Sequence, residues 1–251
     1  MAGDVWQTVE ELQASGRLLV EDGNHGEYRP RRDEFVESGV AFVRAADMRD
    51  GKVDFEKCEH IGSVALARIR KGIGRPGDIL LSHKGTVGKL ARVEVDAPPF
   101  VCSPQTTFWR ILDKTKIDKN YLYGFMRSRL FSSQLASVQG ETDMAPYVSL
   151  TAQRRLRIAL PRFSEQVAIG HLLSALDDKI ALNRHTAETL EAMVRALFKS
   201  WFVDFDPVRA KAERRPVGLS DDLAALFPDS FGGDGLPRGY SIRVWTHNLI
   251  Q

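Results

Sequence analysis

The sequence predicts an α+β domain with mixed β-structure, followed by one long α-helix of the coiled-coil-forming kind. From about residue 17 to residue 112, short apolar runs alternate with Gly, Pro and Asp, which is typical of short strands and turns. Between residues 167 and 202 there is no proline and only one glycine, Gly170. We therefore expect three segments: a globular domain (1–162), a long helix (163–203) and a linker with the start of a second unit (204–251).

Individual elements of the first segment follow from hydrophobic periodicity. Strands are predicted at residues 40–43, 79–81, 93–95, 106–112 and 156–160, with 78–95 as a hairpin turning near residues 84–89. Residues 118–137 change to helical spacing and predict one helix.

The long helix is predicted to begin with Ser164 as its N-cap. Apolar residues then recur at alternating intervals of three and four, which is the a/d pattern of a coiled coil. This seam consists of Leu173, Leu176, Ile180, Asn183, Ala187, Leu190, Val194, Leu197 and Trp201. A helix of this length extends roughly 50–60 Å, so we expect it to need a partner helix. A helix buried within its own domain is the alternative, and the polar Asn183 in the seam argues against it.

Beyond Trp201, proline and glycine pairs interrupt the chain, and only a short helix at residues 221–227 is predicted. This stretch is typical of a linker toward a second domain, but only fourteen residues follow Pro237. The second unit is therefore expected to be missing.

Charge and cysteine content narrow the class of protein. Residues 1–162 carry 25 Lys and Arg against 21 Asp and Glu, whereas residues 163–251 carry 10 against 12. The excess of positive charge lies in the first segment, where an anionic partner is expected. Two cysteines, no signal sequence and no apolar run near ~20 residues predict a cytoplasmic protein that does not enter a membrane.

Several fragments imitate catalytic motifs without their context. Gly72, Gly74 and Gly77 fit a dinucleotide fingerprint, but a proline interrupts it and a strand follows it. The stretch DAPPF (96–100) has Ala97 where an adenine methyltransferase needs a polar residue. Cys58 and His60 could both bind zinc, but no further cysteine or histidine lies at the spacing of a zinc site. Asp78 and Glu94 could belong to a nuclease site, but the Glu-x-Lys motif that such a site needs is absent after Glu94. We expect a non-catalytic chain without cofactor or metal; a free-standing nuclease or methyltransferase is the rival hypothesis.

Three polar loops are candidates for binding double-stranded DNA, because Lys and Arg neutralise phosphates while hydroxyl and amide groups read base edges. Between Arg68 and Arg92 there are seven basic side chains and one acid, Asp78. A second loop spans residues 22–32 and a third spans residues 139–147. The candidate DNA-binding residues are Asn24, His25, Arg29, Arg31, Arg32, Arg70, Lys71, Ser82, His83, Lys84, Thr86 and Lys89.

The order of these fragments resembles a known family. GDILLS (77–82), KGTVGK (84–89), Asp118 and YLY (121–123) are similar to a target-recognition domain of type I restriction–modification specificity subunits. The stretch IALP (158–161), LSALDDKI (173–180), Asn183 and LFKSWFVDFDPV (197–208) resembles the conserved helix of that family and the segment that follows it.

The resemblance implies a function. Members contain two recognition domains separated by two antiparallel helices, and each domain reads one half of a bipartite DNA target. They carry no active site and assemble with methyltransferase (M) and restriction (R) subunits. This chain has one domain and one helix, as a half-length form that is natural, truncated or frame-shifted. We therefore expect a homodimer formed through the helix. The alternative is a helical assembly adaptor whose N-terminal domain binds protein.

Overall fold

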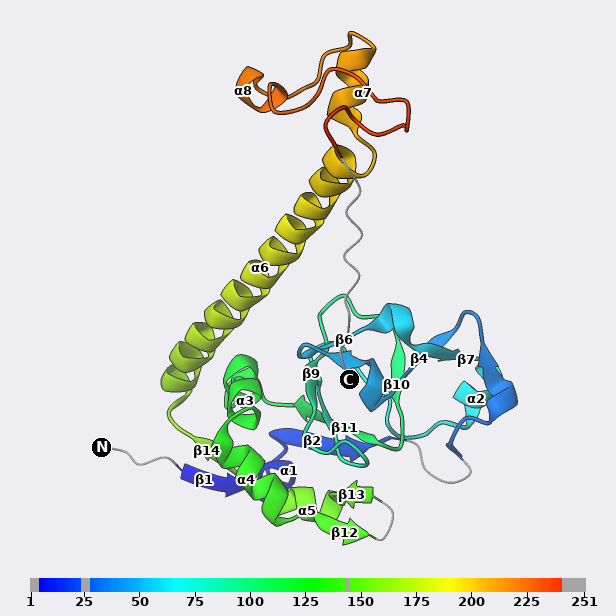
Figure 1. The fold of residues 1–251 in the computed structure, drawn as a ribbon. Coiled ribbons are helices and arrows are strands. Elements are labelled where there is room, and N and C mark those ends of the chain that lie inside the picture. Colours follow the sequence, from blue (N-terminus) through cyan, green and yellow to red (C-terminus); the bar gives the residue numbers. More distant parts are fainter. Residues whose placement is uncertain (1–4, 24–27, 143–144, 241–251) are drawn as a thin grey trace, which may run out of the picture. The chain divides into compact units, whose positions relative to one another are not determined.

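The β-rich first part of the chain forms two main sheets and two small strand pairs in a computed structural model, which describes residues 5–23, 28–142 and 145–240 (Figure 1). In the larger sheet the strand order is β2-β11-β8-β9-β6-β5, and in the smaller it is β10-β4-β7-β3. β11 pairs antiparallel with both β2 and β8 and therefore lies inside the larger sheet. This arrangement confirms the α+β prediction.

The strands of the larger sheet are β2 (Leu18–Asp22), β5 (Met48–Arg49), β6 (Lys52–Val53), β8 (Ile79–Ser82), β9 (Leu90–Arg92) and β11 (Thr106–Ile111). Those of the smaller sheet are β3 (Phe35–Val36), β4 (Val40–Val43), β7 (Glu59–Ile61) and β10 (Phe100–Cys102). The two pairs are β1 (Val5–Thr8) with β14 (Arg157–Leu160) and β12 (Gly140–Thr142) with β13 (Ala145–Tyr147).

The predicted hairpin at 78–95 is confirmed as β8 and β9, but the predicted strand at 93–95 is wrong. Its pairing with β8 ends at Arg92, and the chain turns away through Glu94 and Val95, which are exposed. Val93 still exchanges backbone hydrogen bonds with Gly77 and Asp78, but no described strand pairs with Glu94 and Val95, so the alternating Val residues overstate the length of the strand.

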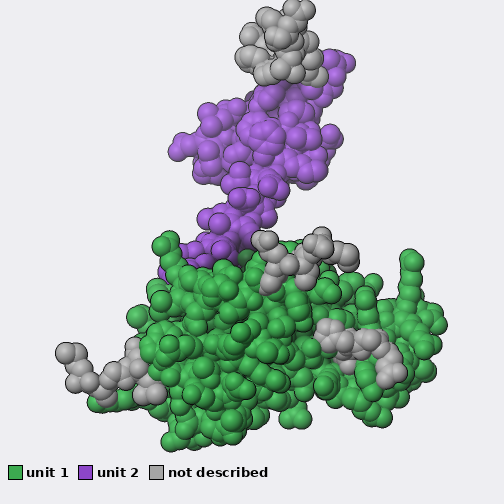
Figure 2. All heavy atoms as spheres, turned by 90° about the horizontal axis from the view of Figure 1, so that it is seen from below, with its two compact units in different colours: residues 1–177 green, residues 178–251 purple. Residues whose placement is uncertain are grey.

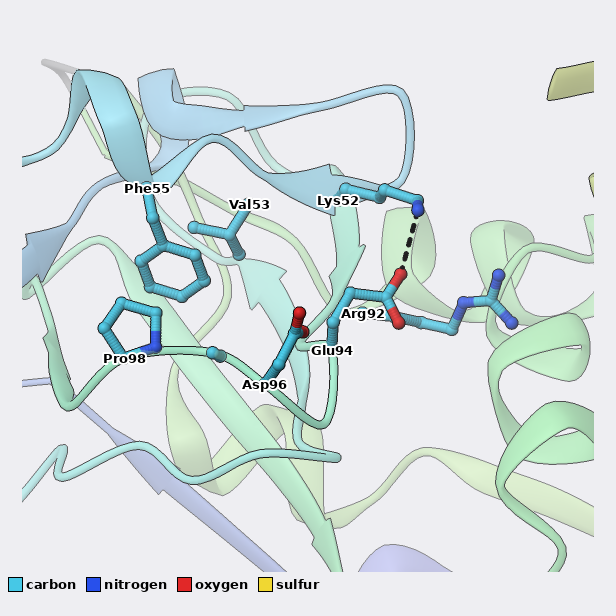
Figure 3. A pocket seen from close by; sticks show the side chains of 8 residues that line it. Lys52, Val53, Phe55, Arg92, Glu94, Asp96 and Pro98 are labelled. Atoms are coloured by element: carbon cyan, nitrogen blue, oxygen red, sulfur yellow. Dashed lines mark ion pairs between the residues drawn. The ribbon is translucent and has the colours of Figure 1, made fainter.

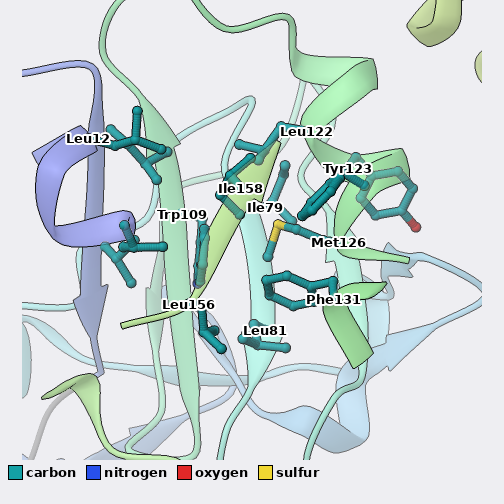
Figure 4. Packing of buried hydrophobic residues seen from close by; sticks show 14 of the residues in the cluster. Leu12, Ile79, Leu81, Trp109, Leu122, Tyr123, Met126, Phe131, Leu156 and Ile158 are labelled. Carbon is teal, nitrogen blue, oxygen red and sulfur yellow. The ribbon is translucent and has the colours of Figure 1, made fainter. Parts of the chain in front are cut away.

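Both faces of the larger sheet are covered. Consecutive residues of a strand point to opposite faces, and on β11 Phe108 and Trp109 belong to different apolar clusters. Trp109 packs with Phe131 and Leu122 in the larger cluster (Figure 4). Phe108 packs with Phe100 in the second cluster, which involves residues of both sheets. Burial on both faces makes this sheet a rigid support for the loops at its ends.

Short helices complete the domain. They are α1 (Val9–Ala14), α2 (Ser63–Arg68), α3 (Lys119–Met126), α4 (Arg129–Ser137) and α5 (Leu150–Arg154), together with the 3-10 turns η2 (Arg32–Glu34), η3 (Ala45–Asp47) and η4 (Phe55–Lys57). The single helix predicted for 118–137 is two, because Ser128 accepts a hydrogen bond from the Phe131 N–H and caps a new helix.

The long helix α6 (Phe163–Phe202) is confirmed as a helix of 40 residues. It begins one residue before the predicted cap, so Ser164 lies in its first turn. The side chain of Glu165 instead accepts a hydrogen bond from the Arg162 N–H at 3.0 Å.

Contacts divide the chain into two compact units, residues 1–177 and 178–251, coloured separately in Figure 2. The second unit contains the rest of α6, then α7 (Asp206–Ala212) and α8 (Asp221–Ala224). The Asp206-Pro207 pair predicts that no long regular element forms here, and α7 is only seven residues long; Pro207 lies in its first turn, where a proline removes no helical hydrogen bond. Aromatic contacts, such as Trp201 with Phe227 and Phe205 with Phe231, hold this unit together.

Candidate nucleic-acid interface

The strand order brings two of the predicted loops to one end of the larger sheet. Asp22 of β2 is paired with Thr107, and Ser82 of β8 is paired with Thr106, so both strands end beside the start of β11. The Gly23 N–H donates to the Thr106 carbonyl at 3.1 Å, and the His83 N–H donates to the Gln105 carbonyl at 2.9 Å. The loops that follow β2 and β8 therefore begin on either side of the turn at 103–105.

A glycine permits this close approach. A Cβ atom on Gly23 would collide with the carbonyl group of Ser103, so a larger residue would push the first loop away from β11.

The basic segment at 70–74 is attached to the same end. The Cys102 N–H donates to the Gly72 carbonyl at 2.7 Å, and the Gly72 N–H donates to Glu21 Oε1 at 2.6 Å. Arg70 and Lys71, which are exposed, therefore lie next to the ends of β10 and β2.

The hairpin formed by β12 and β13 packs against the loop after β8. The Gly85 N–H donates to the Pro146 carbonyl at 3.0 Å, and the Val148 N–H donates to the His83 carbonyl at 2.9 Å. The rings of His83 and Tyr147 are 5.5 Å apart. We call residues 70–74, 82–89 and 103–105, with the described residues of this hairpin, the loop cluster.

The cluster presents unpaired positive charge. Arg70, Lys71 and Lys84 are exposed, and no carboxylate whose side chain the structure describes lies at salt-bridge distance from them. By contrast, Arg68 is paired with Glu34, and Arg110 is bound by both oxygens of buried Asp78 at 2.7 and 2.8 Å. Unpaired cations beside exposed backbone are suited to binding phosphates. Thr86, also predicted to contact DNA, is exposed in the same loop.

Two predicted DNA-contacting residues are buried instead. Ser82 and His83 are both 0% exposed. Ser82 Oγ donates to the Thr86 carbonyl and accepts from the Lys89 N–H, which shapes the turn of the loop. His83 Nδ1 donates to the Val148 carbonyl at 3.0 Å, which ties the loop to the segment after β13. In this conformation they support the loop and are not accessible to a ligand, because both are fully buried. The sequence alone does not reveal which polar residues of a loop face inward.

Lys89 is half-buried, and its Nζ donates to the Ala45 carbonyl at 2.7 Å. This contact uses the ammonium group to hold η3 against the loop. Lys89 is therefore a weaker candidate for a phosphate contact than Lys84 is.

The remaining predicted residues fall elsewhere. Arg29, Arg31 and Arg32 are exposed around η2, which leads into β3 at the edge of the smaller sheet. Among the described residues, no hydrogen bond or ion pair joins them to the loop cluster. Asn24 and His25 lie outside the described residues.

One residue in the cluster was missed. Gln105 is exposed at the turn before β11, between the two loops that flank it. Its neighbours in the sequence are neither basic nor glycine-rich, so composition gave no signal. Its position became apparent only from the pairing of β11 with both β2 and β8.

The fragments that imitate catalytic motifs do not form a site in the described part of the chain. Asp78 is bound to Arg110, while Glu94 pairs with Lys52 at 3.0 Å across a shallow pocket of about 210 Å³ (Figure 3). Cys58 is buried, and residues 72–74 run beside β10 with no helix after Gly77. Among the described residues, no group of three or more His, Cys, Asp and Glu could hold a metal ion. None of the helices described is long and apolar enough to cross a membrane.

Most of the predicted helix seam is exposed. Leu176, Ile180, Leu190, Val194 and Leu197 are 47 to 64% exposed, so no described part of the chain covers their apolar side chains. The two ends of the seam differ. Leu173 packs over Gly124 of α3, and Trp201 contacts Phe227.

Comparison with known proteins decides the family. The model of the type I restriction modification DNA specificity domain matches residues 25–192. The chain belongs to this family. The specificity subunit of the type I restriction enzyme HindI from Haemophilus influenzae is 33% identical over 193 residues, which are 74% of this chain and 40% of the relative. The MjaVIII specificity subunit from Methanocaldococcus jannaschii is 24% identical over 194 residues, 75% of this chain and 44% of that protein.

Solved structures agree on the fold of this specificity domain. A chain from a structure described as showing complex assembly and conformational transition of the type I R-M system aligns with a TM-score of 0.54 and 18% identity, over 78% of this chain and 44% of that one. The HsdS subunit from Thermoanaerobacter tengcongensis aligns with a TM-score of 0.50 and 19% identity, over 78% and 43%. The specificity-domain chain thus spans less than half the length of these relatives.

Proposed function

We propose that the chain supplies DNA sequence specificity to a type I restriction–modification complex and binds one half of a bipartite target through the loop cluster. The observation that carries this proposal is the convergence of Arg70, Lys71 and Lys84 on one end of a rigid sheet, without carboxylate partners among the described residues. The chain itself would be non-catalytic. Methyltransferase (M) and restriction (R) subunits are its proposed partners.

The exposed seam of α6 supports the second part of the proposal. Two copies that pair through these helices would present two identical recognition domains related by a two-fold axis, and so would read a symmetric bipartite site. Methyltransferase subunits are proposed to dock on the same helix.

Charge reversal at the loop cluster tests DNA binding. Binding to duplex DNA should weaken as salt rises, and Lys84→Glu should reduce the slope of log K against log [salt] by about 1 if Lys84 contacts one phosphate. Lys114→Glu is a matched control, because Lys114 is exposed just beyond the opposite end of β11, about 20 Å away along the strand. The measurement is fluorescence anisotropy of labelled duplex over a salt series.

Equal loss in both variants would indicate general electrostatics rather than a site at the loop cluster. Absence of duplex binding by the unaltered protein, with retained binding to a methyltransferase subunit, would favour the assembly adaptor.

A further inference from the structure

The turn at residues 103–105 places one amide side chain at the centre of the loop cluster. The Gln105 carbonyl accepts a hydrogen bond from His83, and its N–H donates to Ser103 Oγ at 3.3 Å. His83, Ser103 and the next residue, Thr106, are all buried. The backbone of Gln105 is therefore fixed by neighbours that cannot easily move.

The side chain of Gln105 is free by comparison. It is exposed, and its amide makes no hydrogen bond to any residue that the structure describes. Lys84 directly follows His83, whose N–H is bonded to the Gln105 carbonyl. Lys71 directly precedes Gly72, whose carbonyl accepts a hydrogen bond from the Cys102 N–H, three residues before Gln105. The exposed amide of Gln105, on a fixed backbone, thus lies between the segments of Lys71 and Lys84, which have no carboxylate partner among the described side chains.

Cations and amides have different tasks at a DNA surface. Contacts from lysine and arginine to phosphates position a protein but carry no sequence information. The amide of glutamine offers a donor and an acceptor together, and this pair matches N7 and the N6 amino group of adenine in the major groove. A rigid backbone favours such readout, because the side chain must meet both atoms with little error.

We propose that Gln105 is a specificity-determining residue that reads one adenine in the half-site. The inference rests on the proposed function, since it requires the loop cluster to face the major groove. Arg70, Lys71 and Lys84 would hold the flanking phosphates.

Selection from a library of randomised duplexes, followed by sequencing, tests the inference. The unaltered full chain should select a motif with one adenine that Gln105→Ala no longer selects, a loss of discrimination of about 5- to 150-fold at that position alone. Gln105→Glu should change the preferred base there to cytosine, because a carboxylate accepts from the cytosine amino group. Lys84→Ala is the matched control and should weaken all sequences alike while it keeps the motif.

The outcomes separate the two proposals. If the unaltered chain selects no motif, the proposed function fails and this inference fails with it. If the chain selects a motif and Gln105→Ala leaves every position unchanged, or weakens all sequences equally, only the role of Gln105 is overturned. Thermal unfolding of Gln105→Ala should match the unaltered chain, since the exposed amide has no partner among the described residues.

Discussion

Burial divides the polar residues of the loop cluster into two groups with different roles. Ser82 and His83 point inward and fix the loop after β8, whereas Lys84 and Gln105 point outward. Ser82, His83 and Lys84 are consecutive, so the alternation between support and surface occurs within three residues. A buried polar group must find hydrogen-bond partners, and here those bonds set the shape of the loop.

The two cysteines are expected to be unreactive in the folded protein. Burial raises the pKa of each thiol to about 12, and Cys58 and Cys102 are 5% and 0% exposed. At pH 8 both thiols therefore stay protonated and inaccessible, and the thiolate is the nucleophile. A thiol reagent such as DTNB should react with neither in native protein and with both after unfolding in guanidinium.

The raised pKa values of the two thiols also predict how the stability of the folded protein depends on pH. A thiol whose pKa is higher in the folded state holds its proton more tightly there, so stability should fall as pH rises above the unfolded value near 9. Rapid labelling of either thiol in folded protein at pH 8 would contradict the prediction that both cysteines are unreactive.

At the scale of elements, the start of α6 is fixed against α3 within the first unit. The side chain of Gln166 accepts from the Asp118 N–H at 3.1 Å and donates to the Lys116 and Pro161 carbonyls at 3.2 and 2.9 Å. One turn later Gly170 contacts the N-terminus of α3, and Arg127 pairs with Asp177 at 2.5 Å. The first turns of the helix are thus part of the first unit.

Gly170→Ala should destabilise this junction. An added Cβ would lie 2.9 Å from the backbone nitrogen of Tyr121 and still closer to Asp118 Oδ1, and backbone cannot move aside cheaply. We expect a loss of about 1–3 kcal/mol in the free energy of unfolding, despite the helix propensity of alanine. Urea unfolding followed by circular dichroism measures it.

Two glycines provide comparisons for that measurement. Gly124→Ala should cost less, because its added Cβ would meet only the flexible end of Leu173. Gly233→Ala should have little effect, since no atom lies within 4 Å of its added Cβ. A Gly170→Ala protein as stable as the unaltered chain would show that the two helices can separate without cost.

At the scale of the whole molecule, the seam of α6 leaves a stripe of apolar side chains exposed. The exposed seam residues lie on one stripe of the helix, and burying each leucine, isoleucine or valine contributes about 1.5–3 kcal/mol. Leu173 and Trp201, at the two ends, already have contacts within the chain. The proposed pairing therefore depends on the residues between them.

Removing apolar surface from the seam should abolish self-association. The unaltered chain is expected to sediment at micromolar concentration with twice its 28.1 kDa mass. Val194→Glu combined with Leu197→Glu should give a monomer, because each copy would have to bury two unpaired carboxylates in an apolar interface. Ala192→Glu, which adds a charge outside the seam, is the control and should leave the dimer intact. A monomeric unaltered chain would exclude the homodimer and leave pairing with methyltransferase subunits as the use of the seam.

The sequence by itself determined the features that depend on local periodicity. The long helix, its seam and the hairpin of β8 and β9 follow from residue spacing, and the family follows from the motifs at 77–89 and 158–208. Residue spacing did not show where an element ends. It predicted a strand at residues 93–95 that is not formed, and it did not show that a new helix begins after Ser128.

Only the tertiary structure decided which polar residues form the surface of the loop cluster. Lys71, Lys84 and Gln105 are far apart in the sequence and meet because β11 pairs with β2 on one side and β8 on the other. Strand pairing is a long-range choice made by backbone hydrogen bonds and the burial of both sheet faces, and no local pattern encodes it. For the same reason the sequence could mark the charged loop around Lys84 but could not distinguish the buried His83 from the exposed Gln105.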